Sequence, residues 1–152
     1  MSNAVAVSLS ATHILEWLAI SLTPGLGPTK ARKLVEHFGG AEAVFHASLT
    51  ELESTGIQAV SAQSIATGKS AELAREEIAR AAVAGVTVIS LEDPCYPPRL
   101  KEIYDPPLVL YVRGSPEVLT QPGIAVVGTR HPTPYSSGMR SGWRATWRRR
   151  GW

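Results

Sequence analysis

The sequence has few of the residues that make covalent or metal cross-links. Its 152 residues include one cysteine, Cys95, which excludes an internal disulfide and favours a reducing compartment. No apolar run approaches the ~20 residues that cross a membrane, and the N-terminus MSNAVAVSLSATH lacks the basic start of a signal peptide. We therefore expect a soluble cytoplasmic protein with no membrane segment. A zinc site is not expected either, because the histidines show no metal-ligand spacing: His13, His37, His46 and His131.

Motifs for catalysis and nucleotide binding are also missing. The chain has no G-x-S-x-G elbow, no G-x-x-x-x-G-K-[ST] loop, and no G-x-G-x-x-G after a predicted strand. Cys95 has no evident base partner, and the adjacent acids Glu92 and Asp93 are expected to point apart at a strand end. No catalytic residue and no cofactor are predicted, so the protein is not expected to be an enzyme.

Charge is unevenly distributed along the chain. The formal net charge is +2, but residues 139–152 hold five of the fifteen Lys and Arg, three of the four Trp, and no acid. Without those arginines, ten basic residues face thirteen acidic ones, a net charge of −3. Arginine interleaved with tryptophan is typical of a segment that contacts phosphates and stacks on bases. Any phosphate site in the rest of the chain must therefore be local.

Residues 11–84 show the periodicity of helices. The apolar residues of THILEWLAISL fall on one helical face, and those of KARKLVEHFGG do so until Gly39 and Gly40 stop the pattern. Shorter helices are expected at AEAVFHA, SLTELEST and QAVSAQSIATG, and the S-x-x-E pattern at residues 48–51 predicts a capping box. The longest predicted helix is SAELAREEIARAAVAG, capped by Ser70 and ended by Gly85.

Beyond Gly85 the sequence changes to short β-branched runs. VTVIS, LVLYV (108–112) and IAVVG (124–128) predict three strands, and near-continuous apolar strands favour a parallel sheet. EDPCYPPRLKEIYDPP separates the first two strands and holds five of the eleven prolines. It is expected to be an ordered crossover loop with at most one short helix near residues 99–103. Three strands without covering helices cannot bury both faces, so the sheet is expected to be incomplete.

The first candidate binding motif is LTPGLGPTKARKLVEHF. Helix, Gly-x-Gly turn and helix is the layout of a helix-hairpin-helix, in which Gly25 and Gly27 allow a phosphate to approach and Lys30 adds charge. A tight connection between two packed helices has the same pattern and is the commoner meaning of such turns.

The second candidate motif is IAVVGTR, followed by HPTPYSSG. A strand that ends in Gly-Thr-Arg places a turn at the carboxyl edge of a sheet, where ligand sites of α/β proteins lie. Gly128 permits close backbone approach, Thr129 offers a hydroxyl, and Arg130 offers a forked donor suited to phosphate. A structural turn with a solvated arginine explains the three residues equally well.

The order of these segments is more specific than any one of them. A helical module with PGLGPTKARKLVEHFG is followed by GVTVISLEDPCYPPRLKEIYDPPLVLYVRG and then by IAVVGTRHPTPYSSGM. From about Leu18 to Met139 this order resembles the DNA-processing protein A family, also called DprA or Smf. The resemblance implies an α+β chain in two parts. These are an N-terminal helical domain, of helix-hairpin-helix or SAM-like type, and the incomplete start of a Rossmann-like parallel α/β domain.

The resemblance also implies a function. Members of the family bind single-stranded DNA in natural transformation and recombination and help to load the RecA recombinase, without catalysis or a cofactor. Gly128, Thr129 and Arg130 match the family's strand-end Gly-Ser/Thr-Arg motif, which lies in the DNA-binding pocket. The GLG turn with Lys30 corresponds to a hairpin and is a secondary candidate for DNA binding.

The family continues past this point with a long helix, a second glycine-rich loop and further strands, which supply the self-association and RecA surfaces. We therefore expect a truncated member, with a helical domain at 11–84, a truncated Rossmann-like domain at 85–138 and an aberrant, out-of-frame tail at 139–152. A selected Arg/Trp motif is the alternative for the tail. For the whole chain the alternatives are a nucleotide-ligand enzyme of the related Rossmann-like group, or a helical protein-interaction module.

Overall fold

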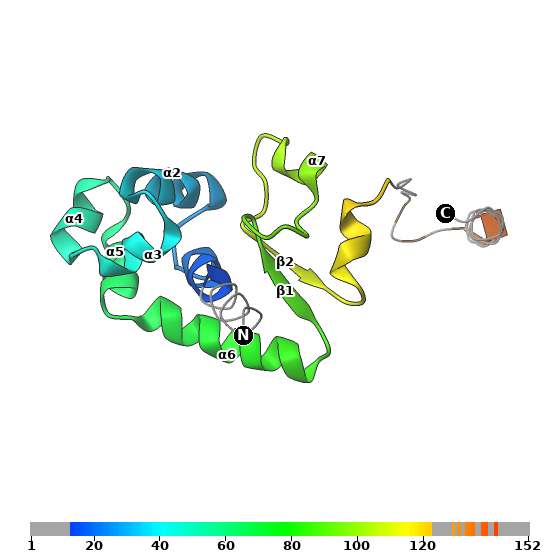
Figure 1. Ribbon diagram of the computed structural model, residues 1–152, viewed down its shortest axis with the longest axis horizontal. Helices are drawn as coiled ribbons and strands as arrows, with labels where there is room; N and C mark the ends of the chain where they lie inside the picture. The colour runs from blue at the N-terminus through cyan, green and yellow to red at the C-terminus, as the bar shows by residue number, and fades with distance from the viewer. Residues whose placement is uncertain are drawn as a thin grey trace, which may run out of the picture. The chain divides into compact units, whose positions relative to one another are not determined.

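The computed structural model in Figure 1 describes residues 13–122, 129, 131, 133–135, 138, 139 and 142. The chain divides into two compact units, residues 1–120 and 121–152, and every element with defined bounds lies in the first. Residues 13–21 are helical. The helices that follow are α2 (Pro28–Phe38), α3 (Ala41–His46), α4 (Leu49–Ser54), α5 (Ala59–Ala66), α6 (Lys69–Val83) and α7 (Pro98–Lys101). The strands are β1 (Thr87–Ser90) and β2 (Val109–Val112), and a 3-10 helix, η1, covers Pro116–Thr120.

Two of the predicted helix boundaries in the N-terminal part are confirmed. Gly39, at the end of α2, has a φ of 79°, and the Gly40 amide donates to the Val35 carbonyl at 3.0 Å. This left-handed residue is the usual glycine stop, because a side chain is strained there. Ser48 and Glu51 form the predicted capping box, in which the Ser48 amide donates to Glu51 Oε2 at 2.8 Å and the Glu51 amide to Ser48 Oγ at 3.3 Å.

The predicted cap of the longest helix is wrong. Helix α6 begins at Lys69 with Gly68 at the N-cap, and Ser70 lies inside the first turn with its side chain fully buried. Ser70 Oγ lies 2.9 Å from Thr23 Oγ1 and 2.8 Å from Ser64 Oγ. Because a buried hydroxyl needs hydrogen-bond partners, Ser70 serves the packing of α6 against two other segments and does not cap the helix.

The described strands form an antiparallel pair, which corrects the expected parallel arrangement. Thr87 pairs with Val112 and Ser90 with Val109, and the Leu91 amide donates to the Leu108 carbonyl at 2.9 Å. The proline-rich segment therefore joins the end of β1 to the start of β2 at the same end of the hairpin. It is not a crossover between parallel strands. A parallel pair needs a crossover that carries the chain back to the other end, commonly a long helix, and α7 has only four residues. The third predicted strand, 124–128, lies outside the described residues.

A single tyrosine anchors the loop between the strands. Tyr96 is 1% exposed, and its hydroxyl donates to the Pro107 carbonyl at 2.8 Å. The Lys101 ammonium lies 5.6 Å from the centre of the Tyr96 ring, within the range of a cation–π contact. The predicted short helix is present as α7, which begins at Pro98, where the missing amide of a proline does no harm.

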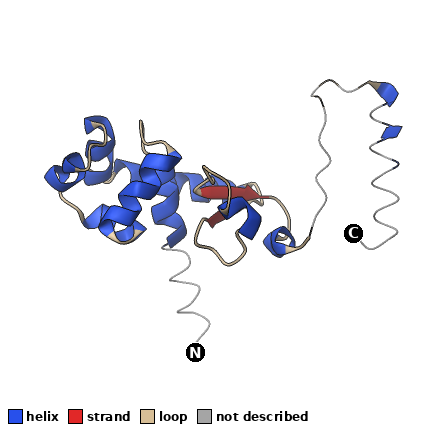
Figure 2. Cartoon of the chain, turned by 90° about the horizontal axis from the view of Figure 1, so that it is seen from above, coloured by secondary structure: helices blue, strands red, loops and turns tan. Residues whose placement is uncertain are grey.

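Two apolar cores connect the helices with the hairpin, and Figure 2 shows the strands next to the helices. Leu108 belongs to the core that contains Leu34 and Leu52, and Val88 belongs to the core that contains Leu18. Packing in residues 13–120 is therefore continuous across the expected boundary at Gly85, and a separate domain at 11–84 stays a prediction. None of the helices in the described part of the chain has the length and apolar character needed to span a membrane.

Candidate nucleic-acid interface

The structure places one residue of the strand-end motif. Thr129 is exposed, and its hydroxyl oxygen accepts a hydrogen bond from the His131 amide at 3.3 Å. A hydroxyl that accepts a hydrogen bond keeps its proton, which can donate to a phosphate oxygen. Gly128 and Arg130 lie outside the described residues, so their positions relative to Thr129 stay predictions.

The GLG turn is held by the protein's own side chains. Gly25 has a φ of +75°, and a β-carbon at this residue would lie 2.4 Å from Gln58 Oε1. Ser61 Oγ donates to the Pro24 carbonyl at 2.7 Å, which ties the turn to α5. At Gly27, in contrast, an added β-carbon meets nothing within 4 Å. Gly25 thus serves the packing of the turn, and Gly27 alone leaves open backbone to a ligand.

The first turn of α2 is tied to the loop before β2. Thr29 Oγ1 donates to Asp105 Oδ1 at 3.1 Å, and Arg32 Nη2 donates to the Tyr104 carbonyl at 3.1 Å and lies 3.5 Å from Asp105 Oδ1. The Arg32 side chain is about one-quarter exposed. Thr29 and Arg32 therefore hold α2 against this loop, although both are close in sequence to the predicted site residue Lys30.

Lys30 is exposed and lies with two further basic residues on one face of α2. Lys33 and His37 follow it at spacings of three and four, and the three side chains line a groove of about 380 Å³. The opposite wall is the turn between α4 and α5, with Thr55, Gly56 and Ile57, and Leu34 also lines the groove. Our sequence reasoning missed Lys33 and His37. Their helical spacing from Lys30 was the signal that could have identified them.

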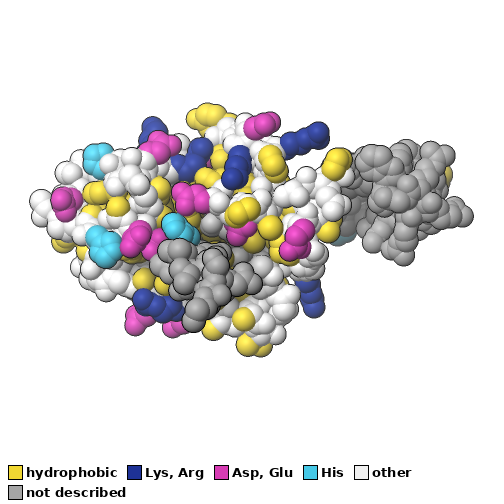
Figure 3. Space-filling view, viewed as in Figure 1, with side chains coloured by type: hydrophobic (Ala, Val, Ile, Leu, Met, Phe, Trp, Pro, Cys, Tyr) yellow, Lys and Arg dark blue, Asp and Glu magenta, His cyan; other side chains and the backbone are white. Residues whose placement is uncertain are grey.

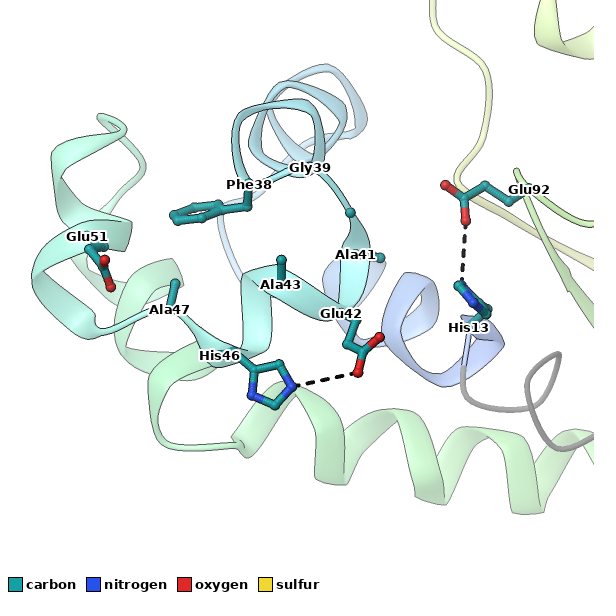
Figure 4. Close-up of a pocket in the computed structure, with 11 residues that line it drawn as sticks. His13, Phe38, Gly39, Ala41, Glu42, Ala43, His46, Ala47, Glu51 and Glu92 are labelled. Atoms are coloured by element: carbon teal, nitrogen blue, oxygen red, sulfur yellow. Dashed lines mark ion pairs between the residues drawn. The ribbon is translucent and has the colours of Figure 1, made fainter.

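A larger pocket, elsewhere on the molecule, is lined by acidic side chains. It has a volume of about 620 Å³ and is lined by parts of α3, the loop before it and the start of the first helix (Figure 4). Its charged side chains are mostly paired. His13 Nδ1 lies 3.6 Å from Glu92 Oε2, and His46 Nε2 lies 3.8 Å from Glu42 Oε1. A pocket lined by three glutamates and two histidines repels phosphate, so it does not qualify as a DNA site.

Glu16 is a buried acid near that pocket. Its side chain belongs to a residue only 9% exposed, and its Oε2 atom has no hydrogen-bond partner in the described structure. Burial raises the pKa of Glu16, and Glu42 raises it further, whereas His13 and His46 lower it. Among the described residues no group of three or more His, Cys, Asp or Glu is arranged to hold a metal ion. The ionised form of Glu16 is therefore expected to destabilise the fold.

The described surface is not uniformly basic. Figure 3 shows lysines and arginines interspersed with aspartates and glutamates on one face. This agrees with the net charge of −3 that the chain has without its C-terminal arginines. A nucleic-acid contact in this part of the protein must therefore be local, as the α2 groove is.

Comparison with known proteins shows which family this chain is related to. The model of the family described as DNA recombination-mediator protein A matches residues 87–152. Protein Smf of Synechocystis is 30% identical over 128 residues, which are 80% of this chain and 32% of the relative. The chain belongs to the DprA/Smf family. The matched range reaches Trp152, so it includes the Arg/Trp segment whose origin the sequence left open.

Two further DprA/Smf relatives match shorter stretches. The DNA processing protein DprA of Bacillus subtilis is 44% identical over 52 residues, 34% of this chain and 18% of that protein. The DprA of Streptococcus pneumoniae is 49% identical over 41 residues, 27% of this chain and 14% of that protein. The chain spans about a third or less of the length of these curated relatives. No solved structure matches it.

Proposed function

We propose that this chain carries part of a single-stranded DNA site of the DprA/Smf type, which acts in transformation and recombination. The observation that carries the proposal is the family match over residues 87–152, because this range includes Gly128, Thr129 and Arg130. Two relatives are named DNA processing proteins, and the matching family is described as a recombination mediator. The exposed hydroxyl of Thr129 is compatible with a phosphate contact.

In this proposal the protein binds DNA without cleaving it. Arg130 contacts a phosphate as a forked donor, Thr129 donates its hydroxyl, and Gly128 lets the strand approach the backbone. Phosphate contacts make the binding tolerant of sequence. The Rossmann-like character of the second part, and the partnership with RecA, belong to the same proposal and rest on the family relationship.

The test compares Arg130→Ala with Arg113→Ala, a change of equal charge at an exposed residue beyond β2. The five C-terminal arginines attract any nucleic acid, so both variants are made in a chain in which these are glutamine, here called the tail-neutral chain. The replaced residues are Arg140, Arg144, Arg148, Arg149 and Arg150. Affinity for labelled oligothymidylate and for a duplex is measured by fluorescence anisotropy over a range of salt concentrations.

We expect Arg130→Ala to weaken binding of the single strand about tenfold, since a charged hydrogen bond contributes roughly 1.5–3 kcal/mol. The slope of log affinity against log salt should fall by about 0.7, the single-strand value for one phosphate. Arg113→Ala should change both quantities less. Equal effects of the two variants would exclude Arg130 from a DNA site, and a tail-neutral chain with no preference for single strands would contradict a site for single-stranded DNA.

A further inference from the structure

The groove on α2 presents unpaired positive charge in a defined geometry. Within the described part of the chain, Lys30 and Lys33 are exposed and make no ion pair or hydrogen bond. Arg32 lies between them in sequence but on another face, where Asp105 and the Tyr104 carbonyl occupy it. The row from Lys30 to His37 extends roughly 10 Å along the helix axis, at about 1.5 Å per residue. This length allows contact with more than one phosphate.

The opposite wall of the groove adds no negative side chain. It is formed by Thr55, Gly56 and Ile57, and no residue that lines the groove is acidic. Gly56 has a φ of +77°, and a β-carbon there would meet nothing within 4 Å, so its backbone is open to a ligand. Glu36 and Glu53 are on the same helices but do not line the groove. The half-buried Ile57 offers an apolar surface beside the charges.

We propose that the groove between α2 and the α4–α5 turn binds the sugar–phosphate backbone of single-stranded DNA, with Lys30 and Lys33 on phosphates. This inference rests on the proposed function and names a second contact for the same ligand. Lysine is a point charge that suits phosphate without demanding a fixed orientation. When one site holds the strand, the second contact becomes intramolecular, so even a weak contact strengthens binding.

We favour DNA over an acidic polypeptide as the ligand of the groove, because the matching family is described as a DNA recombination mediator. The groove also differs from the helix-hairpin-helix contact that the GLG turn predicted. At Gly25 the space beside the GLG turn is filled by the side chains of Gln58 and Ser61. The basic residues of the groove, Lys30 to His37, lie beyond this turn on α2. The basic face of the helix, and not the glycine turn, makes the contact.

The experiment uses the tail-neutral chain with Lys30→Glu and Lys33→Glu together. Its control is Lys69→Glu with Arg75→Glu, an equal charge change at two exposed residues of α6. Thermal melting first establishes that both double variants are folded. We expect the groove variant to bind labelled oligothymidylate at least about tenfold more weakly than the α6 control. Its salt slope should fall by about 1.4, for two single-strand phosphate contacts at about 0.7 each.

Amide chemical shifts locate the contact independently. On titration with oligothymidylate, the Gly56 and Ile57 amides of the tail-neutral chain should shift, and those of α6 should not. Poly-glutamate at the same charge concentration should leave the Gly56 and Ile57 amides in place. If poly-glutamate shifts these amides as strongly as the oligonucleotide does, the groove is a site for acidic polypeptides and the proposal is wrong.

The outcomes separate this proposal from the proposed function. If Arg130→Ala weakens binding while the groove variant and the α6 control behave alike, the groove proposal alone fails. If the tail-neutral chain shows no preference for single strands and Arg130→Ala has no effect, the proposed function fails. Lost affinity in the groove variant, together with a shifted Gly56 amide, supports the groove as a DNA contact.

Discussion

The helices of residues 13–83 and the hairpin with its loop, residues 87–112, differ in what determines their structure. Each helix follows the apolar spacing of its own sequence and ends at a cap or glycine close by. The strands are four residues long, and only β1 has buried side chains. Val88 of β1 and Leu108, the residue before β2, enter cores that consist mainly of helix residues. Local signals therefore specify the first region, whereas the second depends on contacts between distant residues.

The largest effect is expected when Tyr96, the buried side chain that anchors the loop, is removed. Tyr96→Ala deletes a buried ring and its hydrogen bond to the Pro107 carbonyl, so we expect the free energy of unfolding to fall by roughly 3–5 kcal/mol. Tyr104→Ala, in the same loop, removes a side chain that is 92% exposed and should change stability by less than about 0.5 kcal/mol. Urea unfolding measures both. Similar losses would mean that Tyr96 does not anchor the loop.

The next test concerns a connection inside the helical region. Gly25→Ser should destabilise the protein by about 1–2 kcal/mol, because the φ of +75° is strained for any side chain and Gln58 must also move. Gly27→Ser should be neutral or stabilising by a few tenths of a kcal/mol, since serine at this N-cap position can accept an amide hydrogen bond. Thermal unfolding of the two variants, without DNA, provides the measurement. A neutral Gly25→Ser would show that Gln58 does not fix the turn.

A smaller effect is expected from the buried acid of the first helix. The pKa of Glu16 is raised above its ordinary value of 4.5, so the ionised form is less favourable in the folded than in the unfolded protein. The Glu16 carboxyl therefore contributes a loss of stability as the pH rises from about 4.5 through its raised pKa, and Glu16→Gln removes this contribution. At pH 8 we expect the variant to be more stable by on the order of 1 kcal/mol. At pH 4 the advantage should have largely disappeared.

Melting curves of the wild type and Glu16→Gln between pH 4 and pH 8 test whether the stability difference between them grows as the pH rises. Glu42→Gln is a useful companion, because Glu42 is the neighbouring charge that raises the pKa of Glu16 most. It should give a smaller gain in the same direction. A constant difference between Glu16→Gln and wild type at every pH would point to altered packing, and the charge argument would then be wrong.

The smallest effect is expected where the two regions are tied at the surface. Asp105→Ala removes the acceptor of Thr29 and the partner of Arg32, and we expect a loss of about 0.5–1 kcal/mol, as for exposed ion pairs. The loss should shrink at high salt. Glu102→Ala removes an exposed acid from the same loop and serves as the control. If both variants lose the same stability, the tie through Asp105 contributes nothing specific.

The candidate site could be predicted only in part. The order of the sequence segments led to the family and to Gly128, Thr129 and Arg130, because these three residues are adjacent in sequence and follow a predicted strand. Lys30 was identified for its place after a glycine turn, and Lys33 and His37 were not, since a groove between α2 and the α4–α5 turn exists only after the helices pack. The packing of Gly25 against Gln58 could not be predicted for the same reason, because Gln58 is distant in sequence.

The sequence by itself determined the helices, the capping box, the glycine stop after α2 and the short helix in the proline-rich loop. These features depend on residues a few positions apart, whose backbone preferences act locally. Only the tertiary structure decided that β1 and β2 pair antiparallel, that Ser70 bonds to Thr23 and Ser64 in place of capping α6, and that Tyr96 anchors its loop. Strand direction and buried polar contacts are set by which distant surfaces must be covered together, and no local pattern encodes that choice.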